Sequence, residues 1–164
     1  MKILIMGLPG SGKTYLAERM QPILKAAWYN ADKVREMAND WDFSPDGRIR
    51  QSLRMKSLAD FEKKHGRIVI CDFVCPTFET KNNFDPDITI WMDTIKFGRY
   101  EDTNKMFEKP KNVDFQVTEM NDTNHHTIAK EILKNVWLEK TYSSNARKMA
   151  TMAWRSSRTF QKMY

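Results

Sequence analysis

The sequence predicts a three-layer α/β/α fold in which a parallel sheet of about five strands lies between two layers of helices. Short apolar runs with β-branched residues, typical of buried parallel strands, recur along the chain. Segments with helical spacing of apolar residues alternate with them, as in sheets covered on both faces. The 164 residues are enough for one such domain with a proper core.

The first sixteen residues predict a strand, a glycine-rich loop and the start of a helix. Residues 1–6, Met-Lys-Ile-Leu-Ile-Met, are a short apolar run. Residues 7–14, Gly-Leu-Pro-Gly-Ser-Gly-Lys-Thr, match the P-loop pattern G-x-x-x-x-G-K-[ST]. Helical spacing follows at Leu16, Ala17, Met20, Ile23 and Leu24. This context indicates the P-loop NTPase version of the α/β fold.

The chemistry of phosphate binding explains the loop. Its glycines allow backbone N–H groups to approach a triphosphate closely, and the loop ends at a helix N-terminus that favours an anion. Lys13 should reach the β- and γ-phosphates of ATP, and the Thr14 hydroxyl should bind Mg²⁺. The residues expected to bind ATP here are Gly7, Pro9, Gly10, Ser11, Gly12, Lys13 and Thr14.

Further elements follow in order along the chain. Strands are expected at residues 26–31, 67–71, 88–92 and 113–118. Helices are expected around residues 34–38, at 48–64 and after 122–124. Residues 44–47, Ser-Pro-Asp-Gly, indicate a turn, and Leu53, Leu58 and Phe61 are expected on the apolar side of the helix that follows.

Two polar segments are expected to lack core elements. Residues 77–86 read as a polar connection, and residues 95–112 suit a mobile lid. Within the lid segment, Phe97, Tyr100 and Phe107 have two interpretations of equal weight, which are a sandwich around a base and an ordinary lid hinge.

Acidic residues follow three of the expected strands. Asp32, Asp72 and Asp93 come at or just after strand ends, and ligands of open parallel sheets bind at that edge. Asp32, opposite the P-loop, is expected to orient or deprotonate an acceptor hydroxyl. Lys13 and Asp32 are therefore the predicted catalytic residues, and Thr14 and Asp72 are the predicted magnesium residues, with Asp72 acting through water.

Cationic residues suggest where an acceptor binds. Arg48, Gln51 and Arg54 are three apart, so they share one helix face. Arg35 and Arg48 could clamp an anionic acceptor with bidentate contacts. A solvated helix face explains the spacing of Arg48 and Arg54 equally well.

Several segments resemble adenylylsulfate kinase, the family that phosphorylates the 3′-hydroxyl of adenosine 5′-phosphosulfate with ATP. Residues 30–35, Asn-Ala-Asp-Lys-Val-Arg, resemble the family's Asp-Gly-Asp-Asn-Val-Arg. Residues 42–51, which begin Asp-Phe-Ser and include Arg48 and Gln51, resemble Gly-Phe-Ser with a following Arg and Asn. Residues 73–76, Phe-Val-Cys-Pro, resemble Phe-Ile-Ser-Pro. The resemblance continues at residues 92–94 and 102–109 and covers about residues 1–135.

This resemblance implies an ATP- and Mg²⁺-dependent kinase for a small anionic acceptor. It implies that Arg99 contacts the nucleotide. The acceptor-binding residues that it implies are Arg35, Arg48, Gln51, Phe73 and Cys75.

Three positions depart from the family pattern. Cys75 stands where the family has a reactive Ser, Asn30 replaces the first Asp of Asp-Gly-Asp, and Asp72 replaces a small residue. The lid is also shorter. These departures leave two other hypotheses open: a kinase for a nucleoside, a sugar or a hydroxymethylated base in DNA, and a nucleotide-binding module without turnover.

Composition limits the partners. No apolar stretch approaches the ~20 residues of a membrane helix, and a strand and P-loop at the start leave no room for a signal peptide. Cys71 and Cys75 lack metal or redox spacing and read as reduced core thiols, and His125 and His126 read as capping or surface residues. We expect a cytoplasmic protein. The net charge of +6 suits anionic small ligands without requiring nucleic acid, and a homodimer is compatible with the sequence.

The last segment, residues 141–164, differs from the kinase-like residues 1–140. It is basic, and residues 143–164 contain no acidic residue. Three interpretations are considered: a nucleic-acid-binding arm, a disordered end and a frameshifted remnant. Our hypothesis is the third, which would make this chain the kinase half of a longer bifunctional protein. Codons can be chosen for residues 141–158 that, read one nucleotide later, include Gly-Arg-Trp-Gln-Pro-Trp-His-Gly-Gly-His. That string resembles a nucleotidylyltransferase motif, and some phage sequences pair such a domain with an adenylylsulfate-kinase-like one.

Overall fold

The computed structural model describes residues 1–138 and 141. The chain divides into two compact units, residues 1–128 and 129–164, and the described residues of the second unit are helical. The predicted last helix is present over residues 124–138. Apart from Thr141, the segment 141–164 and its three interpretations lie outside the described residues. In the described part of the chain, every helix is too short or too polar to cross a bilayer.

Strands and helices alternate through the first unit, as predicted. In chain order they are β1 (Lys2–Met6), α1 (Lys13–Leu24), β2 (Ala27–Asn30), α2 (Ala31–Ala38), α3 (Pro45–Lys64), β3 (Val69–Asp72), α4 (Phe78–Phe84), β4 (Ile88–Met92), α5 (Glu101–Met106) and β5 (Phe115–Val117). All five expected strands are present; β4 has the predicted bounds, and the other strand ends lie within two residues of the predicted ones.

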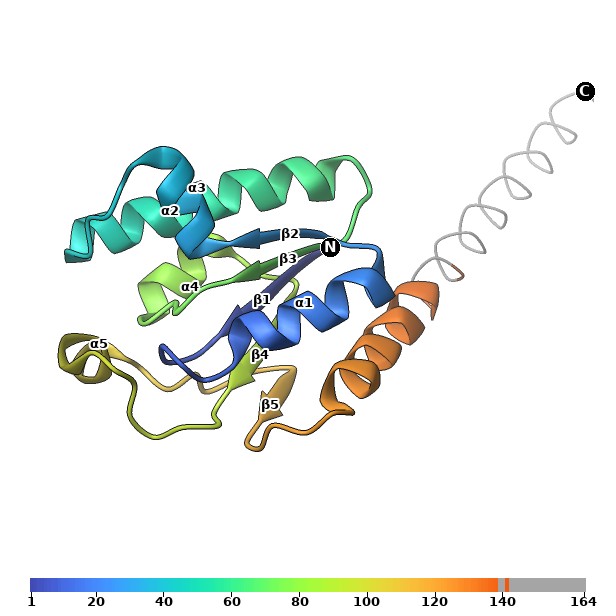
Figure 1. The fold of residues 1–164 in the computed structure, drawn as a ribbon. Helices are drawn as coiled ribbons and strands as arrows, with labels where there is room; N and C mark the ends of the chain where they lie inside the picture. The colour runs from blue at the N-terminus through green and yellow to red at the C-terminus, as the bar shows by residue number, and fades with distance from the viewer. Residues whose placement is uncertain (139–140, 142–164) are drawn as a thin grey trace, which may run out of the picture. The chain divides into compact units, whose positions relative to one another are not determined.

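The sheet is wholly parallel, with strand order β2-β3-β1-β4-β5. The central strand β1 places Ile3 opposite Ile70 of β3 and opposite Ile88 of β4. Because every strand runs in the same direction, all carboxyl ends lie at one edge (Figure 1). This arrangement confirms the predicted three-layer α/β fold with five strands.

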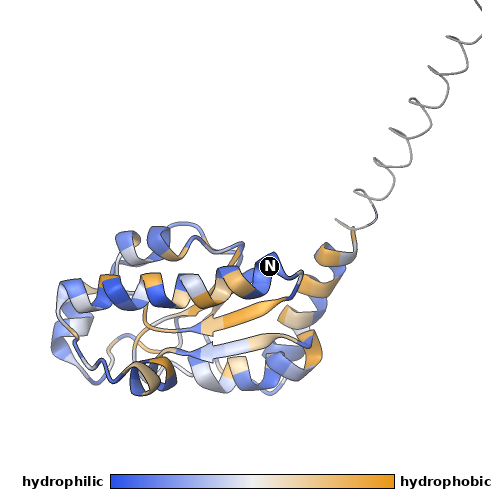
Figure 2. Ribbon diagram, turned by 90° about the horizontal axis from the view of Figure 1, so that it is seen from above, coloured by the Kyte–Doolittle hydropathy of each residue, from blue (hydrophilic) through white to orange (hydrophobic). Residues whose placement is uncertain are grey.

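The two faces of β1 pack against different helices. Leu4 and Met6 belong to a buried cluster with Met55 and Ala59 of α3 and with Phe84 of α4. Side chains alternate along a strand, so the neighbouring isoleucines of β1 turn to the other face, where α1 packs. Figure 1 shows α1 on one side of the sheet and α3 with α4 on the other. In Figure 2, hydrophobic and hydrophilic residues alternate along the helices, and hydrophobic strand residues lie between them.

Helix α3 begins earlier than predicted, at the residues that indicated a turn. Ser44 is the N-cap, and its side chain accepts a hydrogen bond of 3.1 Å from the backbone N–H of Gly47. Pro45 occupies the first turn, where its missing N–H costs nothing. The turn prediction for residues 44–47 was therefore wrong, because Ser-Pro-Asp-Gly serves equally well as a helix start.

The buried face of α3 also differs from the predicted one. Leu53 is 45% exposed and Phe61 is 61% exposed, whereas Met55 and Ala59 are fully buried. Gln51 lies on the buried face with them. The prediction for Leu53 and Phe61 was wrong because it assigned the apolar side by residue type, and the buried face includes polar side chains that find hydrogen-bond partners.

Two short helices occupy segments predicted to lack them. Thr77 caps α4 through a reciprocal capping box with Thr80, in which each side chain accepts from the other residue's backbone N–H. Helix α5 lies in the lid segment, and its Thr103 is buried. Local capping, rather than an apolar stripe, begins α4, and this explains why periodicity missed it.

Replacement of Gly7 by alanine should destabilise the fold by about 3 kcal/mol or more. Gly7 has φ +147°, and a Cβ there would lie 2.6 Å from the carbonyl oxygen of Met92. Gly66 provides the matched control, because it has φ +75° but a Cβ there would meet no atom within 4 Å. Gly66→Ala should cost only about 1 kcal/mol, the strain of a positive φ. Urea denaturation measures both values, and equal losses would contradict the role of the Met92 contact.

Candidate functional site

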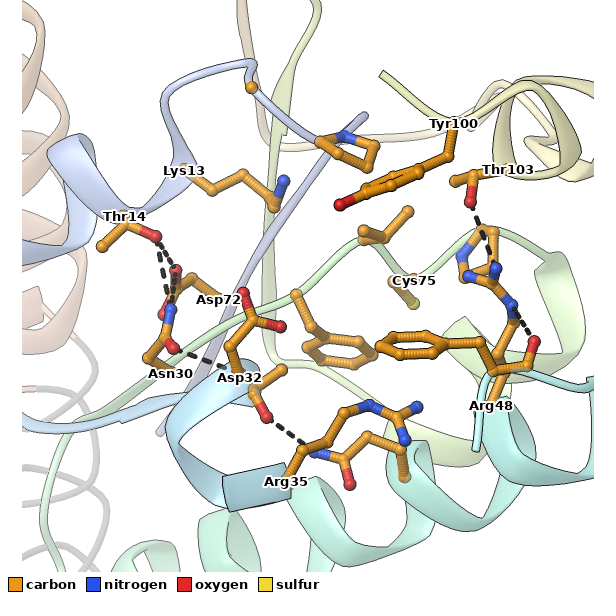
Figure 3. A pocket seen from close by; sticks show the side chains of 18 of the residues that line it. Lys13, Thr14, Asn30, Asp32, Arg35, Arg48, Asp72, Cys75, Tyr100 and Thr103 are labelled. Atoms are coloured by element: carbon orange, nitrogen blue, oxygen red, sulfur yellow. Dashed lines mark hydrogen bonds between the residues drawn. The ribbon is translucent and has the colours of Figure 1, made fainter. Parts of the chain in front are cut away.

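A cavity of about 710 Å³ opens at the carboxyl edge of the sheet (Figure 3). The P-loop, helix α2, the start of α3 and the lid segment around α5 all contribute to its walls. Among the predicted site residues, those that line it are Pro9, Gly10, Gly12, Lys13, Thr14, Asp32, Arg35, Arg48, Gln51, Asp72, Phe73, Cys75 and Arg99. The structure thus brings residues between positions 9 and 103 to one cavity.

Two predicted P-loop residues, Gly7 and Ser11, pack against the protein interior and do not line the cavity. Gly7 contacts Met92 on β4, and Ser11 is 1% exposed. The backbone carbonyl of Ser11 accepts a 2.8 Å hydrogen bond from the Thr94 hydroxyl. Gly10 and Gly12 have φ near +90°, which an L side chain rarely adopts. Gly12 is also the N-cap of α1, and no described side chain caps that helix, so its first N–H groups remain available to an anion.

Lys13 is the P-loop lysine. Its Nζ donates a 2.9 Å hydrogen bond to the carbonyl of Leu8 within the same loop. Burial lowers the pKa of Lys13 to about 8, while the nearby carboxylates of Asp72 and Asp32 act in the opposite direction. A triphosphate in the cavity would favour the charged ammonium, so Lys13 is suited to respond to an anionic ligand.

Thr14 lies beside Asp72, at the end of β3. The Thr14 hydroxyl donates to Oδ2 of Asp72 at 2.7 Å, and Nδ2 of Asn30 donates to the same oxygen at 2.9 Å. The indole N–H of Trp28 donates to Oδ1 at 2.7 Å. Burial raises the pKa of Asp72, and these three hydrogen bonds and Lys13 oppose the rise. Sequence reasoning missed Trp28, because only the strand register brings it to Asp72.

Asp32 lies in the first turn of α2 rather than at the strand end itself. Asn30 caps that helix by accepting hydrogen bonds of 3.1 Å from the backbone N–H groups of Asp32 and Lys33. This cap fixes the direction in which α2 leaves the sheet. Figure 3 shows the Asp32 carboxylate pointing into the cavity on the side facing Lys13. Asp32 and Lys13 therefore face the same part of the cavity.

Arg35 is buried beneath the loop that joins α2 to α3. Its guanidinium donates to the backbone carbonyls of Asp40 and Asp42 at 2.9 Å and lies 4.6 Å from the ring centroid of Phe43. Burial lowers the pKa of Arg35, and Asp40 opposes that shift. Arg35 also donates to the carbonyl of Gly47 at 3.5 Å, so its guanidinium holds this loop and the start of α3 beside the cavity.

Arg48 connects the acceptor side with the lid segment. Its Nε donates to the carbonyl of Phe43 at 2.8 Å. Its Nη2 donates to Asp102 at 3.0 Å and to the hydroxyl of Thr103 at 3.1 Å, both on α5. The side chain remains on the cavity wall, as Figure 3 shows, so an anionic ligand would compete with Asp102 for it.

Gln51 and Arg54 are engaged in packing. Nε2 of Gln51 donates to the carbonyl of Ala31 at 3.1 Å, and Arg54 donates to Oε1 of the same amide. Arg54 also pairs with Asp40, which Arg50 holds from the other side. These contacts join α3 to α2 and to the loop between them. Gln51 also lines the cavity.

Phe73 and Cys75 form the floor of the acceptor side. The Phe73 ring meets the Phe84 ring edge-on at 5.5 Å between centroids. Cys75 is 1% exposed, has φ +48° and contacts the Thr80 hydroxyl at 3.6 Å. Burial raises the pKa of the Cys75 thiol to about 12, and burial likewise raises the pKa of Cys71. Both are core thiols, as expected, and neither is a ready nucleophile.

Aromatic side chains stand on two sides of the cavity. Trp41 and Phe43 are about half exposed, with ring centroids 6.4 Å apart. Tyr100 lines the cavity, and Figure 3 shows it across from Arg35. The other two lid aromatics differ, because Phe97 is 79% exposed and Phe107 packs against the core cluster. Of the three predicted lid aromatics, Tyr100 is the one that reaches the cavity.

Comparison with known families identifies one that matches this chain. The model of the adenylylsulphate kinase family matches residues 1–89. That match includes the P-loop, Asp32, Arg48 and Asp72, and it ends before the lid segment. A probable adenylyl-sulfate kinase from Aeropyrum pernix is 33% identical in an alignment of 87 residues that covers 48% of this chain and 46% of that protein. The match therefore spans less than half the length of this relative.

Solved structures share the fold. An APS kinase from Mycobacterium tuberculosis, determined in complex with AMPPNP and APS, aligns with a TM-score of 0.62 and 19% identity, and covers 81% of this chain and 95% of its own. A sugar kinase from Janibacter sp. HTCC2649 aligns with a TM-score of 0.59 and 13% identity, covering 84% and 94%. At these identities the alignments show the fold and leave the acceptor undefined.

Binding of a triphosphate should be accompanied by proton uptake at Lys13. The free lysine, with a pKa of about 8, is mostly neutral at pH 9, and bound phosphates raise that pKa. Isothermal titration of AMPPNP at pH 9, in two buffers with different ionisation enthalpies, should reveal uptake of roughly 0.5–1 proton. Lys13→Arg keeps its charge at pH 9 and should take up none. Equal uptake by the two proteins would contradict this assignment.

Proposed function

Because the chain belongs to the adenylylsulphate kinase family, we propose that it transfers the γ-phosphate of ATP to the 3′-hydroxyl of adenosine 5′-phosphosulfate. The observation that carries this proposal is the single cavity that contains both Lys13 of the P-loop and Asp32, with arginines on the side opposite the loop. The donor and acceptor of a phosphoryl transfer must meet in line within one such space. A cytoplasmic location fits the proposal, since ATP and reduced thiols coexist there.

The donor half of the site fits ATP. The open N-terminus of α1 and the glycine backbone offer N–H groups to the phosphates, and Lys13 adds a positive charge. Arg99 lines the cavity and is proposed to contact the nucleotide. These groups stabilise charge that develops during transfer, which is the main catalytic contribution in reactions of this class.

The residues present also fit a magnesium ion. The Thr14 side chain is exposed, and because its hydroxyl donates its proton to Asp72, the oxygen keeps a lone pair for a cation. Thr14 would hold the ion and Asp72 would support it. When bound with the nucleotide, Mg²⁺ neutralises charge on the β- and γ-phosphates.

On the acceptor half, Asp32 would orient the hydroxyl of the acceptor and accept its proton as the new bond forms. Arg48 would hold the anionic part of the acceptor, with Arg35 beneath it supplying positive potential. Phe73 and Cys75 would form the wall against which the acceptor rests. The loop between α2 and α3 and the lid segment would limit the access of water, which otherwise competes for the γ-phosphate.

Two observations support a different acceptor as the alternative. Cys75 replaces the family's Ser on the acceptor wall, and the family match ends before the lid. A nucleoside, a sugar or a hydroxymethylated base in DNA would be the acceptor in that case. A nucleotide-binding module without turnover remains the third hypothesis. An acceptor screen separates all three.

Release of ADP measures the proposed transfer directly. The protein with Mg·ATP should release ADP faster when adenosine 5′-phosphosulfate is added, and Asp32→Asn should lower kcat by about 10²–10⁴-fold because an amide cannot accept the hydroxyl proton. Asp46→Asn, on an exposed carboxylate that does not line the cavity, is the matched control and should leave the rate unchanged.

Each outcome of that assay has a clear meaning. Stimulation by a nucleoside, a sugar or hydroxymethylated DNA in place of the sulfate ester would replace the proposed acceptor. AMPPNP binding without stimulation by any acceptor would favour the module without turnover. Full activity of Asp32→Asn would refute the role of Asp32.

Removal of Arg48 should weaken acceptor binding more than turnover. Arg48→Ala should raise the KM for the acceptor about tenfold and change kcat by less than about threefold, because it removes a contact made in both ground and transition states. Asp102→Ala breaks the same lid contact but keeps the cation, so its KM should not rise. Lys56→Ala, on the same helix and away from the cavity, controls for net charge. Equal KM increases in Arg48→Ala and Asp102→Ala would assign the effect to the lid.

A further inference from the structure

The buried carboxylate of Asp72 collects hydrogen bonds from three different side chains. Thr14 comes from α1, and Trp28 and Asn30 come from β2. The parallel register places Asn30 directly opposite Asp72. Asp72 is 2% exposed, so its two oxygens depend on these partners rather than on water. Figure 3 shows Thr14, Asn30 and Asp72 gathered on the P-loop side of the cavity.

The three donor groups determine which type of side chain can occupy position 72. An indole N–H can only donate, so Oδ1 of Asp72 must accept from Trp28. The side-chain amide of Asn30 cannot be flipped, because its oxygen accepts hydrogen bonds from the backbone N–H groups of Asp32 and Lys33. Its nitrogen must therefore donate to Oδ2, the same oxygen that receives the Thr14 proton. Both side-chain oxygens of residue 72 must accept, which requires a carboxylate.

The acceptor role of Asp72 fixes the Thr14 hydroxyl. With its proton directed to Asp72 at 2.7 Å, the Thr14 oxygen accepts a hydrogen bond of 3.3 Å from Nδ2 of Asn30 and keeps a lone pair for another partner. Position 30, where the related motif has a carboxylate, is Asn here, and the carboxylate stands one strand away at position 72. The pair keeps one negative charge at this point of the sheet edge, beside Lys13.

We propose that Asp72 is a positioning residue that orients the Thr14 hydroxyl toward a nucleotide-bound metal ion, and that Asn30 and Asp72 form one unit in which the carboxylate can occupy either position. This inference rests on the proposed function only in assuming a metal–nucleotide complex at the P-loop. It changes the prediction for Asp72, which acts through Thr14 and is not itself a ligand of the ion.

The exchange Asn30→Asp with Asp72→Asn gives Trp28, Thr14 and the capped N–H groups an acceptor again, with Thr14 donating to position 30 instead of position 72. An Asp at position 30 still caps α2 with one oxygen and offers the other to Thr14, whose hydroxyl already lies 3.3 Å from Nδ2 of Asn30. An Asn at position 72 can accept from Trp28 through its oxygen and donate its amide to the new carboxylate. Asp72→Asn alone cannot satisfy all three donors, whichever way its amide turns.

The experiment measures AMPPNP affinity with Mg²⁺ and with EDTA, so it requires neither acceptor nor turnover. In the unmodified protein Mg²⁺ should strengthen binding. Asp72→Asn should reduce this strengthening by about tenfold or more, as expected when the partner of a metal-binding group is lost. The double variant Asn30→Asp/Asp72→Asn should restore it to within about threefold. Asp46→Asn, a matched change on an exposed carboxylate, should have no effect.

The double variant keeps the inference testable whatever the single variant does. Thermal melts establish which proteins are folded, and if Asp72→Asn does not fold, recovery of folding and of Mg²⁺-dependent affinity in the double variant supports the unit. Asp72→Asn with unchanged Mg²⁺ dependence, or a double variant no better than the single one, overturns it. If the acceptor screen fails while the Mg²⁺ pattern is as expected, the proposed acceptor is wrong and the inference about Asp72 stands.

Discussion

The site depends on the parallel pairing of β1, β2 and β3. This pairing brings the P-loop, the start of α2 and the end of β3 to one edge, although they are far apart in the sequence. The register between β2 and β3 places Asn30 against Asp72 to within one residue. A slip of one residue would turn every side chain to the opposite face and would separate that pair. The packing of the buried strand residues that fixes this register therefore also fixes the positions of the site residues at the sheet edge.

On the side of the cavity proposed to bind the acceptor, the main constraint is that a buried guanidinium must find hydrogen-bond acceptors. Arg35 is 4% exposed, and a guanidinium so deeply placed must find acceptors, which it does in the backbone carbonyls of the loop between α2 and α3. Asp40, held by Arg50 and Arg54, fixes the same loop from outside. The half-exposed ring of Phe43 therefore lines the cavity from a loop whose position is fixed by these hydrogen bonds and ion pairs.

The strands, the P-loop and Asp32 could be predicted because their signals are local. A β-branched apolar run or a glycine pattern has the same meaning wherever the rest of the chain goes. The role of Trp28 could not be predicted, because its partner Asp72 is 44 residues away and is specified only by strand register. Leu53 was misassigned because residue type does not reveal which side of a helix faces the sheet. Helix α4 was missed because its capping residues, not apolar spacing, define it.

The state of Cys75 bears on whether the proposed phosphoryl transfer could pass through a covalent intermediate. Where the family pattern has a reactive Ser, Cys75 is buried, has a pKa raised to about 12 and is held by Thr80. A neutral, buried thiol cannot attack a phosphate efficiently, because the thiolate is the nucleophile. A covalent intermediate at this position is therefore disfavoured in this protein. The direct transfer proposed above, from the P-loop nucleotide to an acceptor that Asp32 is proposed to orient, needs no such intermediate.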